Sequence, residues 1–593
     1  MWPATAIVAA VWCRASIVPY RMPLVRKIVF VNQFRRRSCS AFIVDHRSYS
    51  NENRNEDHIK SNYPDISLPR QHLIEYLFDG FRSFSDRVSL QCGLTERKYT
   101  FDDVMVKSTN LSKALRKKLN LREGDVVALL LPNIPEFFIC AFGSMLGGLK
   151  VTTVNPIYTP DEIKRQLLDA DVKAIVTLVP FWQLAKASVD LTKNNLHIIT
   201  IKNTPGESTP TGAIDLQQLV ESKIDIPDLE VPSPNETVFI PYSSGTTGLP
   251  KGVELTSSNI VSNITQVSQP DFKLVDRDKP TQDVSIAVLP MFHVYGFTTL
   301  LALMRDGVKV VTLPKFHPDT YIKSLQNYKP TVLLLVPPII IFLSSHPGVK
   351  SEYLSSLRSI TSGAAPLGAL DEEKLRQKIG SPLNVIQGYG LSETSPGVTM
   401  TPLKQQGKFP GSMGTPLQNT LIKIVDSDGK HVGYNRNGEV WVKGPQVMRG
   451  YLNRPDETVN SFHDGWFKTG DLVRCDEHGM VYIVDRMKEL IKVKGFQVPP
   501  AELEEIIRDF PSVAEAAVIG VPHERDGEVP RAYVISKSNQ TIDVDKLQEY
   551  VSSKVARHKR LTGGISVIDN LPKNASGKIL RKELKELYVK TGV

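Results

Sequence analysis

A glycine-rich loop at 242–252, YSSGTTGLPKG, contains the first candidate functional residues. An apolar run at 237–241 precedes it and predicts a buried strand that leads into the loop. Glycine lets backbone N–H groups crowd around an anion, hydroxyl groups add donors, and lysine adds a point charge. The loop therefore predicts a polyphosphate ligand. Its candidate binding residues are Ser243, Ser244, Gly245, Thr246, Thr247, Gly248 and Lys251.

This loop is not a Walker A motif, which ends in Gly-Lys and a hydroxyl residue. Pro250 stands where that motif has its second glycine, and Gly252 follows Lys251 in place of serine or threonine. A plain surface loop is the alternative, because clusters of glycine, serine and threonine are common in loops.

The string resembles the phosphate-loop signature of the acyl-adenylate-forming enzymes. This family includes acyl-CoA synthetases, 4-coumarate–CoA ligases, beetle luciferases and peptide-synthetase adenylation domains. The resemblance covers about residues 70–590, with five motifs in the family's order. It implies an AMP-forming acid–thiol ligase that uses ATP, Mg²⁺ and coenzyme A to activate a carboxylic acid through acyl-AMP. The acid would be aromatic, or a fatty acid of medium or long chain.

A second motif, GYGLSET at 388–394, follows an expected strand. A ring between two glycines can lie flat against a base, and a carboxylate can hold Mg²⁺ through hard oxygen atoms. Spacing alone fits a turn equally well. The resemblance implies that Tyr389 stacks on adenine and that Thr394 contacts phosphate. It also implies that Glu393 and Thr247 contact the metal ion. Further nucleotide contacts are implied for Gly363, Ala364, Ala365, Gln387, Gly388 and Gly390.

Charged residues between 471 and 497 match the family's ribose and hinge positions. A carboxylate at Asp471 can accept from both hydroxyls of a ribose, and the resemblance implies Arg486 as the second ribose contact. Lys488 occupies the hinge position, ahead of a hairpin that builds the pantetheine tunnel for coenzyme A. Lysines at alternate positions also fit an exposed strand face. The hairpin residues implied at the coenzyme are Lys492, Lys494, Gly495 and Gln497.

The last motif, PKNASGKI at 572–579, places Lys578 beside Gly577. A lysine on a glycine-hinged loop can reach both an attacking carboxylate and the α-phosphate. Lys578 matches the family's adenylation lysine, and a basic C-terminal tail is the alternative. A non-catalytic binding scaffold would be expected to lack this lysine or the metal carboxylate, but Lys578 and Glu393 are both present.

The segment MFHVYGF at 291–297 matches the family's aromatic and histidine segment. His293 is implied to gate the carboxylate site, although a lone histidine is more often a core residue. Many plant coumarate ligases have a lysine where Thr361 stands, which argues against a hydroxycinnamate substrate. Beetle luciferases have His-His-Gly-Phe in this segment, so a luciferase-type oxygenase is the less favoured alternative. The acyl wall is implied to include Tyr295, Phe297, Thr361 and Gly363.

Expected helices and strands alternate along the chain around these motifs, which favours α/β layers with largely parallel sheets. From residue 485 onward charges become denser and the elements shorter. We expect a large N-terminal domain of layered α/β sheets at 71–485. A small, mobile C-terminal α+β domain is expected at 486–593, hinged at 486–489. The expected helices are 101–118, 137–147, 502–510, 543–556 and one capped at 159–162; the expected strands are 126–131, 151–154, 173–177, 516–521 and 532–535.

The net charge of +9 is concentrated near the N-terminus. Residues 1–50 contain eight Lys or Arg and one acid, Asp45, so +2 remains for the rest of the chain. A body so near neutral gives no argument for nucleic-acid binding. The basic, acid-poor segment 1–45 predicts a mitochondrial transit peptide, and a polar linker is expected at 46–70. A disordered tail, or a start at Met22 in a cytoplasmic protein, is the alternative.

The sequence matches neither a membrane span nor a peroxisomal address. Its most apolar run, 332–343, is about twelve residues long and contains two prolines, whereas a spanning helix needs roughly 20 residues. This run instead predicts a buried strand and the start of a helix. The last three residues, 591–593, are not Ser-Lys-Leu. Five scattered cysteines without a CxxC pair argue against a disulfide framework or a zinc site.

Overall fold

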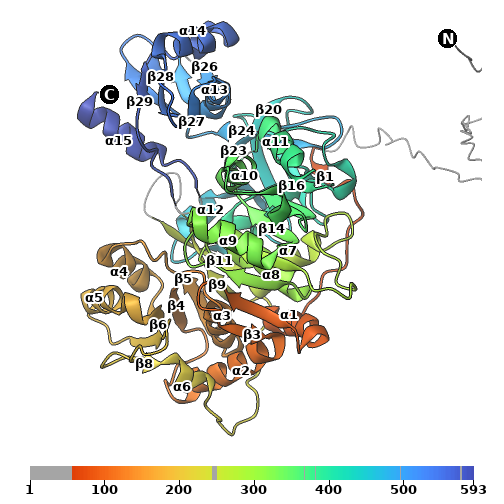
Figure 1. Cartoon of the computed structure of the whole chain (residues 1–593), viewed down its shortest axis with the longest axis vertical. Helices are drawn as coiled ribbons and strands as arrows, with labels where there is room; N and C mark the ends of the chain where they lie inside the picture. Colours follow the sequence, from red (N-terminus) through yellow and green to blue (C-terminus); the bar gives the residue numbers. More distant parts are fainter. Residues whose placement is uncertain are drawn as a thin grey trace, which may run out of the picture. The chain divides into compact units, whose positions relative to one another are not determined.

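The computed structural model describes residues 57–243, 250–365, 367–380, 382–494, 496–574 and 577–592. They belong to one compact unit, Asp57–Val593. Within this described part of the chain, five β-sheets with flanking helices build the fold (Figure 1).

The largest sheet carries the phosphate-loop hairpin at one edge. Its strands are β4 (Val126–Leu130), β5 (Lys150–Thr153), β6 (Val172–Leu178), β7 (His197–Ile201), β8 (Ile214–Asp215), β9 (Thr237–Ile240), β10 (Tyr242–Ser243), β11 (Lys251–Thr256) and β21 (Gly450–Tyr451). They follow the order β10-β11-β9-β5-β4-β6-β7-β8, with β21 beside β11. The strands from β9 to β8 run parallel. Every residue of β4 is buried, as expected of a parallel strand covered on both faces.

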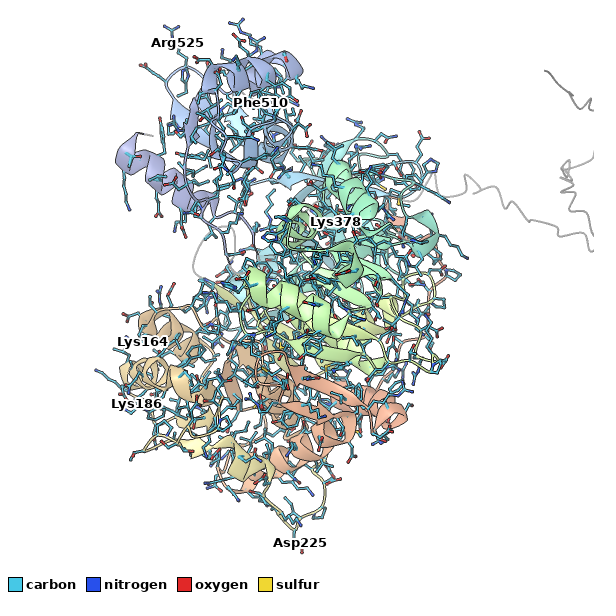
Figure 2. The ribbon with its side chains drawn as sticks, in the orientation of Figure 1. Lys164, Lys186, Asp225, Lys378, Phe510 and Arg525 are labelled. Atoms are coloured by element: carbon cyan, nitrogen blue, oxygen red, sulfur yellow. The ribbon has the colours of Figure 1, made fainter. Side chains whose placement is uncertain are left out.

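Helices along this stretch of the chain cover the sheet. They are α2 (Phe101–Lys117), α3 (Glu136–Leu146), α4 (Pro160–Asp169), α5 (Trp182–Thr192) and α6 (Leu216–Val220). Helix α3 is buried along nearly its whole length, whereas α2 and α4 expose polar residues. Helix α4 begins with the expected cap: the Thr159 N–H donates to the Glu162 carboxylate at 2.8 Å, and the Glu162 N–H donates to the Thr159 hydroxyl at 3.4 Å. Lys186 on α5 extends away from the sheet (Figure 2). The elements predicted over 101–177 are present within one or two residues of their predicted bounds.

Two smaller mixed sheets complete the α/β part. One has the order β12-β13-β2-β3 and the other β14-β15-β16-β17-β18. In the second, β14, β15 and β16 are parallel, so their carboxyl ends meet at one edge and bring Ser362 beside Gln387. The strands are β2 (Val88–Cys92), β3 (Lys98–Thr100), β12 (Val284–Ala287), β13 (Lys309–Thr312), β14 (Val332–Leu335), β15 (Ser359–Ser362), β16 (Asn384–Gly390), β17 (Gly397–Met400) and β18 (Thr415–Pro416).

The apolar run at 332–343 forms strand β14 and most of helix α10, as predicted. Among the described helices, none is long and apolar enough to cross a bilayer. The helices associated with these sheets are α1 (Leu73–Phe81), α7 (Ser257–Val267), α8 (Val294–Arg305), α9 (Pro318–Tyr328), α10 (Pro337–Ser345) and α11 (Ala369–Ile379).

The fourth sheet corrects the expectation of largely parallel strands. Its members are β1 (Ile59–Lys60), β19 (Leu421–Val425), β20 (Asn437–Lys443), β22 (Phe462–His463), β23 (Trp466–Cys475) and β24 (Val481–Arg486), with α12 (Pro455–Asn460) nearby in the chain. All of its strand pairs are antiparallel. Short links without a helix join β19 to β20 and β23 to β24, and such links can only return a strand antiparallel to its neighbour.

The predicted linker at 46–70 is wrong in its second half. Ile59 and Lys60 pair with β19, and Asp57 forms an ion pair with Lys423. Further along, the Ile66 N–H donates to the Asn419 side chain. The fold therefore includes residues from 57 onward. A two-residue edge strand among polar neighbours has no hydrophobic periodicity, so the pattern of the sequence gave no sign of it.

The C-terminal elements have a core of their own. The order is β25 (Ile491–Val493), β26 (Phe496–Val498), α13 (Pro500–Arg508), β27 (Val513–His523), β28 (Gly527–Ser536), α14 (Val544–Lys554), β29 (Ile565–Val567) and α15 (Arg581–Thr591). Leu503, Val518 and Leu547 are buried together there. The helices and strands predicted in this region are present. Since β24 belongs to the fourth sheet and β25 to this one, the change of sheet falls within 487–490.

Candidate active site

A cavity of about 970 Å³ brings most of the predicted motifs together. The ends of β15 and β16, the start of α8, the end of β24 and the 572–580 loop all contribute to its wall. The predicted site residues that line it are Ser243, Lys251, His293, Tyr295, Thr361, Gly363, Ala364, Gly388, Tyr389, Gly390, Glu393, Arg486, Lys488 and Lys578.

Part of the predicted phosphate loop lies outside the described residues, but its two ends do not. Ser243 and Lys251 face each other in the β10–β11 hairpin. The Lys251 ammonium forms an ion pair with Glu457 and lies 5.1 Å from the centre of the Tyr451 ring. The predictions that fall outside the described residues concern Ser244, Gly245, Thr246, Thr247, Gly248, Gly495 and the side chain of Gln497.

Glu393 is a buried carboxylate that contacts the phosphate-loop hairpin. One of its oxygens accepts hydrogen bonds from the Ser243 hydroxyl at 3.2 Å and the Tyr451 hydroxyl at 3.0 Å. Its side chain is buried at the cavity wall. Among the described residues, no group of three or more His, Cys, Asp or Glu could hold a metal without other ligands. A metal at Glu393 would therefore need oxygen atoms from a nucleotide, which is how proteins usually hold Mg²⁺.

Asp471 and Arg486 form a fixed pair across two strands. They are opposite each other in the β23–β24 register, with Arg486 Nε 3.1 Å from Asp471 Oδ1. The other Asp471 oxygen accepts from the Tyr389 hydroxyl at 2.7 Å. Burial raises the pKa of Asp471, while the Arg486 guanidinium acts in the opposite direction. The contact with Tyr389 joins the predicted base-stacking residue to the predicted ribose carboxylate.

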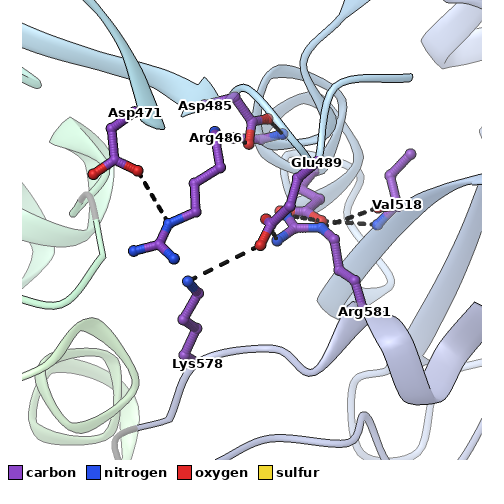
Figure 3. Close-up of polar contacts among 9 residues, drawn as sticks. Asp471, Asp485, Arg486, Glu489, Val518, Lys578 and Arg581 are labelled. Atoms are coloured by element: carbon purple, nitrogen blue, oxygen red, sulfur yellow. Dashed lines mark hydrogen bonds and ion pairs between the residues drawn. The ribbon is translucent and has the colours of Figure 1, made fainter. Parts of the chain in front are cut away.

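Lys578 enters this charged group from the C-terminal elements (Figure 3). Its ammonium lies 4.0 Å from a carboxylate oxygen of Glu489. Gly577, at φ +79°, makes the turn that a side chain would strain, and the Lys578 N–H donates to the Asn574 side chain at 2.8 Å. Burial lowers the pKa of Lys578 to about 8, helped by Arg486 and opposed by Glu489 and Asp471.

A second set of charges supports Lys578, and sequence reasoning did not find it. Arg581 donates to Glu489 at 2.5 Å and to both oxygens of Glu504 at 2.8 and 2.9 Å. Glu504 in turn accepts from the Val518 N–H at 2.8 Å (Figure 3). Arg581 follows Lys578 by three residues and Glu489 follows the hinge lysine by one. Because both residues lie within three positions of a matched motif, this closeness in sequence was the signal that could have identified them.

The link between β24 and β25 is short and locally bonded. The Met487 N–H donates to the Gly470 carbonyl at 3.0 Å, and the Glu489 N–H donates to the Arg486 carbonyl at 2.9 Å. Lys488 lies between them and lines the cavity. The predicted hinge at 486–489 thus coincides with the passage from one sheet to the next.

The acyl side of the cavity begins at the N-terminus of α8. His293 is the N-cap, and its Nδ1 accepts from the Tyr295 N–H at 3.3 Å. Burial lowers the pKa of His293 to about 4, so the ring is neutral at physiological pH. The Tyr295 hydroxyl lies 3.3 Å from the carbonyls of Leu335 and Thr361. A Cβ at Gly363 would be 2.9 Å from the Tyr295 ring, so glycine allows this close packing.

Phe297 corrects the predicted acyl wall. It is fully buried, and its ring stacks on Phe239 at 4.2 Å and on Phe138 at 5.7 Å between centroids. It does not line the cavity. Residues two apart on a helix point to different faces, so Tyr295 and Phe297 could not both face the acid. Phe297 belongs to the core.

Several other predicted site residues lie just behind the cavity wall or away from it. Gln387 bonds the Leu367 backbone at 3.0 and 3.3 Å. The buried Thr394 hydroxyl is within hydrogen-bond distance of the Leu391 and Pro396 carbonyls. Lys494 forms an ion pair with Asp526 at 3.1 Å. In this structure the predicted residues that do not line the cavity are Ala365, Gln387, Thr394, Asp471, Lys492 and Lys494, together with Phe297.

Comparison with known proteins identifies the family. The model of the AMP-binding enzyme family matches residues 78–452, and that of the AMP-binding enzyme C-terminal domain matches residues 502–578. The chain belongs to the AMP-binding enzymes. The predicted acyl-adenylate-forming fold, with a large α/β domain and a small C-terminal domain, is thereby confirmed.

Relatives of this AMP-binding enzyme match over nearly their whole length. It is 39% identical to a 4-coumarate–CoA ligase from Pinus taeda, over 89% of this chain and 97% of the relative. It is 36% identical to a probable 4-coumarate–CoA ligase 1 from Dictyostelium discoideum, over 90% and 98%. The structure resembles ATP-bound MatB from Rhodopseudomonas palustris, with a TM-score of 0.77, 27% identity, and 87% and 98% of the two chains covered. The o-succinylbenzoate CoA synthetase MenE from Bacillus subtilis, in complex with its acyl-adenylate intermediate, gives a TM-score of 0.73, 28% identity, and 87% and 99% coverage.

Proposed function

We propose that this enzyme joins a carboxylic acid to coenzyme A in two steps. First, a carboxylate oxygen of the acid attacks the α-phosphorus of ATP and pyrophosphate leaves, which gives acyl-AMP. Second, the sulfur of coenzyme A attacks the acyl carbon, its proton is released and AMP leaves, which gives the thioester. One observation carries the proposal: Lys578 lines the same cavity as Glu393 and His293.

The charged residues explain how the first step is made possible. Attack of one anion on another is opposed by repulsion, and a positioned cation stabilises the charge that develops in the transition state. With a pKa of about 8, Lys578 is mostly an ammonium at neutral pH. Arg486 lines the cavity and is held by the buried Asp471 behind it, so we place the ribose at this pair. The neutral His293 can stand beside the acid without adding charge.

Mg²⁺ is part of the proposal because the residues present fit it. Mg²⁺ is usually bound by one or two carboxylates together with substrate phosphates, and Glu393 is a single buried carboxylate at the cavity wall. Bound there, Mg²⁺ would supply positive charge against the phosphates. Thr247 is proposed as a second contact from its place in the phosphate loop, which lies outside the described residues.

The second step is proposed to need movement at Lys488. Lys578 lines the cavity in this structure, while the residues of the hairpin β25–β26 that the structure describes do not. Rotation at the link 487–490 would exchange the two, bringing Lys492, Lys494, Gly495 and Gln497 toward coenzyme A. Closure of this kind also shields the reactive adenylate from water.

The names of the relatives support a CoA ligase function for this chain, but they do not all name the same acid. One is named for 4-coumarate and another for o-succinylbenzoate. A purified full-length enzyme should therefore exchange pyrophosphate into ATP only when a suitable acid is present, and should consume coenzyme A with the same acid. Exchange that proceeds equally without any acid, or that is absent with every aromatic and aliphatic acid tested, would overturn the proposal.

We also propose that residues 1–45 direct the enzyme to mitochondria, on the basis of their basic, acid-poor composition. Residues 1–50 fused to a fluorescent protein should co-localise with mitochondria. The same fusion with Arg35, Arg36 and Arg37 changed to glutamine should stay cytoplasmic. Diffuse cytoplasmic signal from both fusions would contradict this proposal.

A further inference from the structure

The lysine of the phosphate loop is paired with a carboxylate that the proposed reaction does not use. Lys251 begins β11, and its ammonium forms an ion pair with Glu457 on α12. Strand β21 pairs with β11, and α12 packs against β21. The two side chains lie far apart in the sequence and are brought together by these neighbouring strands and the helix that follows them.

One member of this ion pair faces the cavity and the other does not. Lys251 lines the cavity, whereas Glu457 stands outside its wall. The Lys251 ammonium also lies 5.1 Å from the centre of the Tyr451 ring, and the Tyr451 hydroxyl donates to Glu393 at 3.0 Å. The ion pair is therefore separated by a single aromatic side chain from the carboxylate proposed to contact Mg²⁺.

Glu457 has a second cation within reach. One of its carboxylate oxygens pairs with Lys251, and the other lies 3.7 Å from Arg454 Nε. Arg454 is itself held by Asp169, whose carboxylate accepts from the guanidinium at 2.8 Å. If the Lys251 ammonium turns to another anion, Glu457 still has a cation beside it. The ion pair can therefore open without leaving this carboxylate uncompensated.

A lysine that is paired with a carboxylate holds an anion less tightly than a lysine alone. The pair has no net charge, and the carboxylate repels phosphate oxygens at short range. The side chains of Lys251 and Glu457 are 20% and 39% exposed, and ion pairs with this much access to water contribute little to stability. A polyphosphate with several charges can therefore take the ammonium from Glu457, and Glu457 can take it back.

We propose that Glu457 is a positioning residue that competes with the β- and γ-phosphates of ATP for Lys251, and so helps pyrophosphate to leave after the first step. This inference rests on the proposed CoA ligase function. The β- and γ-phosphates are placed at Lys251 because Lys578 is the lysine proposed for the α-phosphate. When ATP binds, the Lys251 ammonium turns from Glu457 to the phosphates. After acyl-AMP has formed, Glu457 draws the ammonium away from pyrophosphate, and no covalent bond changes in either exchange.

The first test measures this competition in the full-length enzyme. Glu457→Gln removes the carboxylate, so the concentration of pyrophosphate that gives half-maximal ATP–pyrophosphate exchange should fall about three- to tenfold. The KM for ATP should fall as well. The affinity for AMP, measured by isothermal titration, should stay the same, because AMP has no β- or γ-phosphate. An unchanged or higher half-maximal concentration of pyrophosphate, or an equal gain in affinity for AMP, would overturn the inference.

The matched control is Asp456→Asn. It removes the same charge one residue away, from an exposed side chain that does not line the cavity. Its half-maximal concentration of pyrophosphate should equal that of the unchanged enzyme, and an equal fall in both variants would overturn the assignment to Glu457. Glu457→Ala repeats the measurement in case Glu457→Gln lowers the yield of folded protein.

A double variant tests whether Glu457 acts through Lys251. In the Lys251→Gln background there is no ammonium to release, so adding Glu457→Gln should lower the half-maximal concentration of pyrophosphate by a smaller factor than it does in the unchanged enzyme. An equal factor in both backgrounds would overturn the inference. Failure of the proposed function is a separate result: exchange in the unchanged enzyme would then be absent with every acid, or would proceed equally without any acid.

Discussion

The proposed nucleotide side and the proposed acyl side of one cavity are built in different ways. On the proposed nucleotide side, Arg486 and Lys578 line the cavity; strand register pairs Arg486 with the buried Asp471, and the turn at Gly577 positions Lys578. On the proposed acyl side, the start of α8 contributes His293, Tyr295 and Thr299 to the wall, and these side chains carry no formal charge. A charge in such a site works only at a set distance from its partner, whereas an apolar wall is specified mainly by volume. Substitution of a charged residue should therefore slow the reaction, whereas substitution in the acyl wall should change which acid is accepted.

The largest effect is expected at Lys578. Lys578→Ala removes the cation that offsets the charge of the attacking carboxylate and the phosphate, so adenylation should slow about 10²–10³-fold. Thioester formation from preformed acyl-AMP should be nearly unchanged, because that step has no attack on phosphorus. Rapid-quench assays of each half-reaction measure both rates. Equal loss in both half-reactions would show that Lys578 acts on the fold or on coenzyme A binding instead.

A smaller effect on the nucleotide side is expected at Asp471. Asp471→Asn keeps the size of the side chain but removes the charge that pairs with Arg486, and should weaken ATP binding by about 1.5–3 kcal/mol. Isothermal titration with a non-hydrolysable ATP analogue measures this change. The control is Asp464→Asn, since Asp464 is an exposed aspartate close in sequence. Equal affinities for the two variants would argue against Asp471 as a nucleotide contact.

The pH profile tests how the charges are coupled. Lys578 has a pKa lowered to about 8 and is needed as the ammonium, so adenylation should fall as pH rises through about 8. Glu489 favours the charged form of Lys578. Glu489→Gln should therefore move this alkaline fall to lower pH, and exchange rates across the pH range measure the shift. Glu505→Gln, at an exposed position on α13, is the control and should leave the profile in place. A shift to higher pH in Glu489→Gln would contradict the assignment.

The smallest effect on the reaction is expected at Phe297. Phe297→Leu removes ring contacts with Phe239 and Phe138 from the core, and should destabilise the fold by about 1–3 kcal/mol. The ratio of activities with long and short acids should stay unchanged, because Phe297 does not line the cavity. Thermal unfolding and the two exchange assays measure these quantities. If Phe297→Leu changed the acid preference while leaving the melting temperature constant, the assignment of the two faces of α8 would be reversed.

Motifs and elements close in sequence could be predicted, whereas pairings between distant residues could not. The glycine-rich strings, Lys578 and the cap at Thr159 each carry their signal within a few residues. Arg581 meets Glu489 and Glu504 across 92 and 77 positions of sequence, and a single sequence does not indicate such partners. The error at Phe297 was different, because helical periodicity held the answer: the stripe of residues at 295, 299 and 302 excludes position 297.

The two faces of α8 have a consequence for how such enzymes diverge. Phe297 packs with neighbouring rings in the core, while Tyr295 and Thr299 line the cavity from the same helix. After gene duplication, substitutions at the cavity-lining positions of α8 can change which acid one copy accepts, while the residues proposed for the ATP chemistry stay the same. Enzymes that descend from one ancestor can then share a reaction mechanism and differ in the acid that they activate.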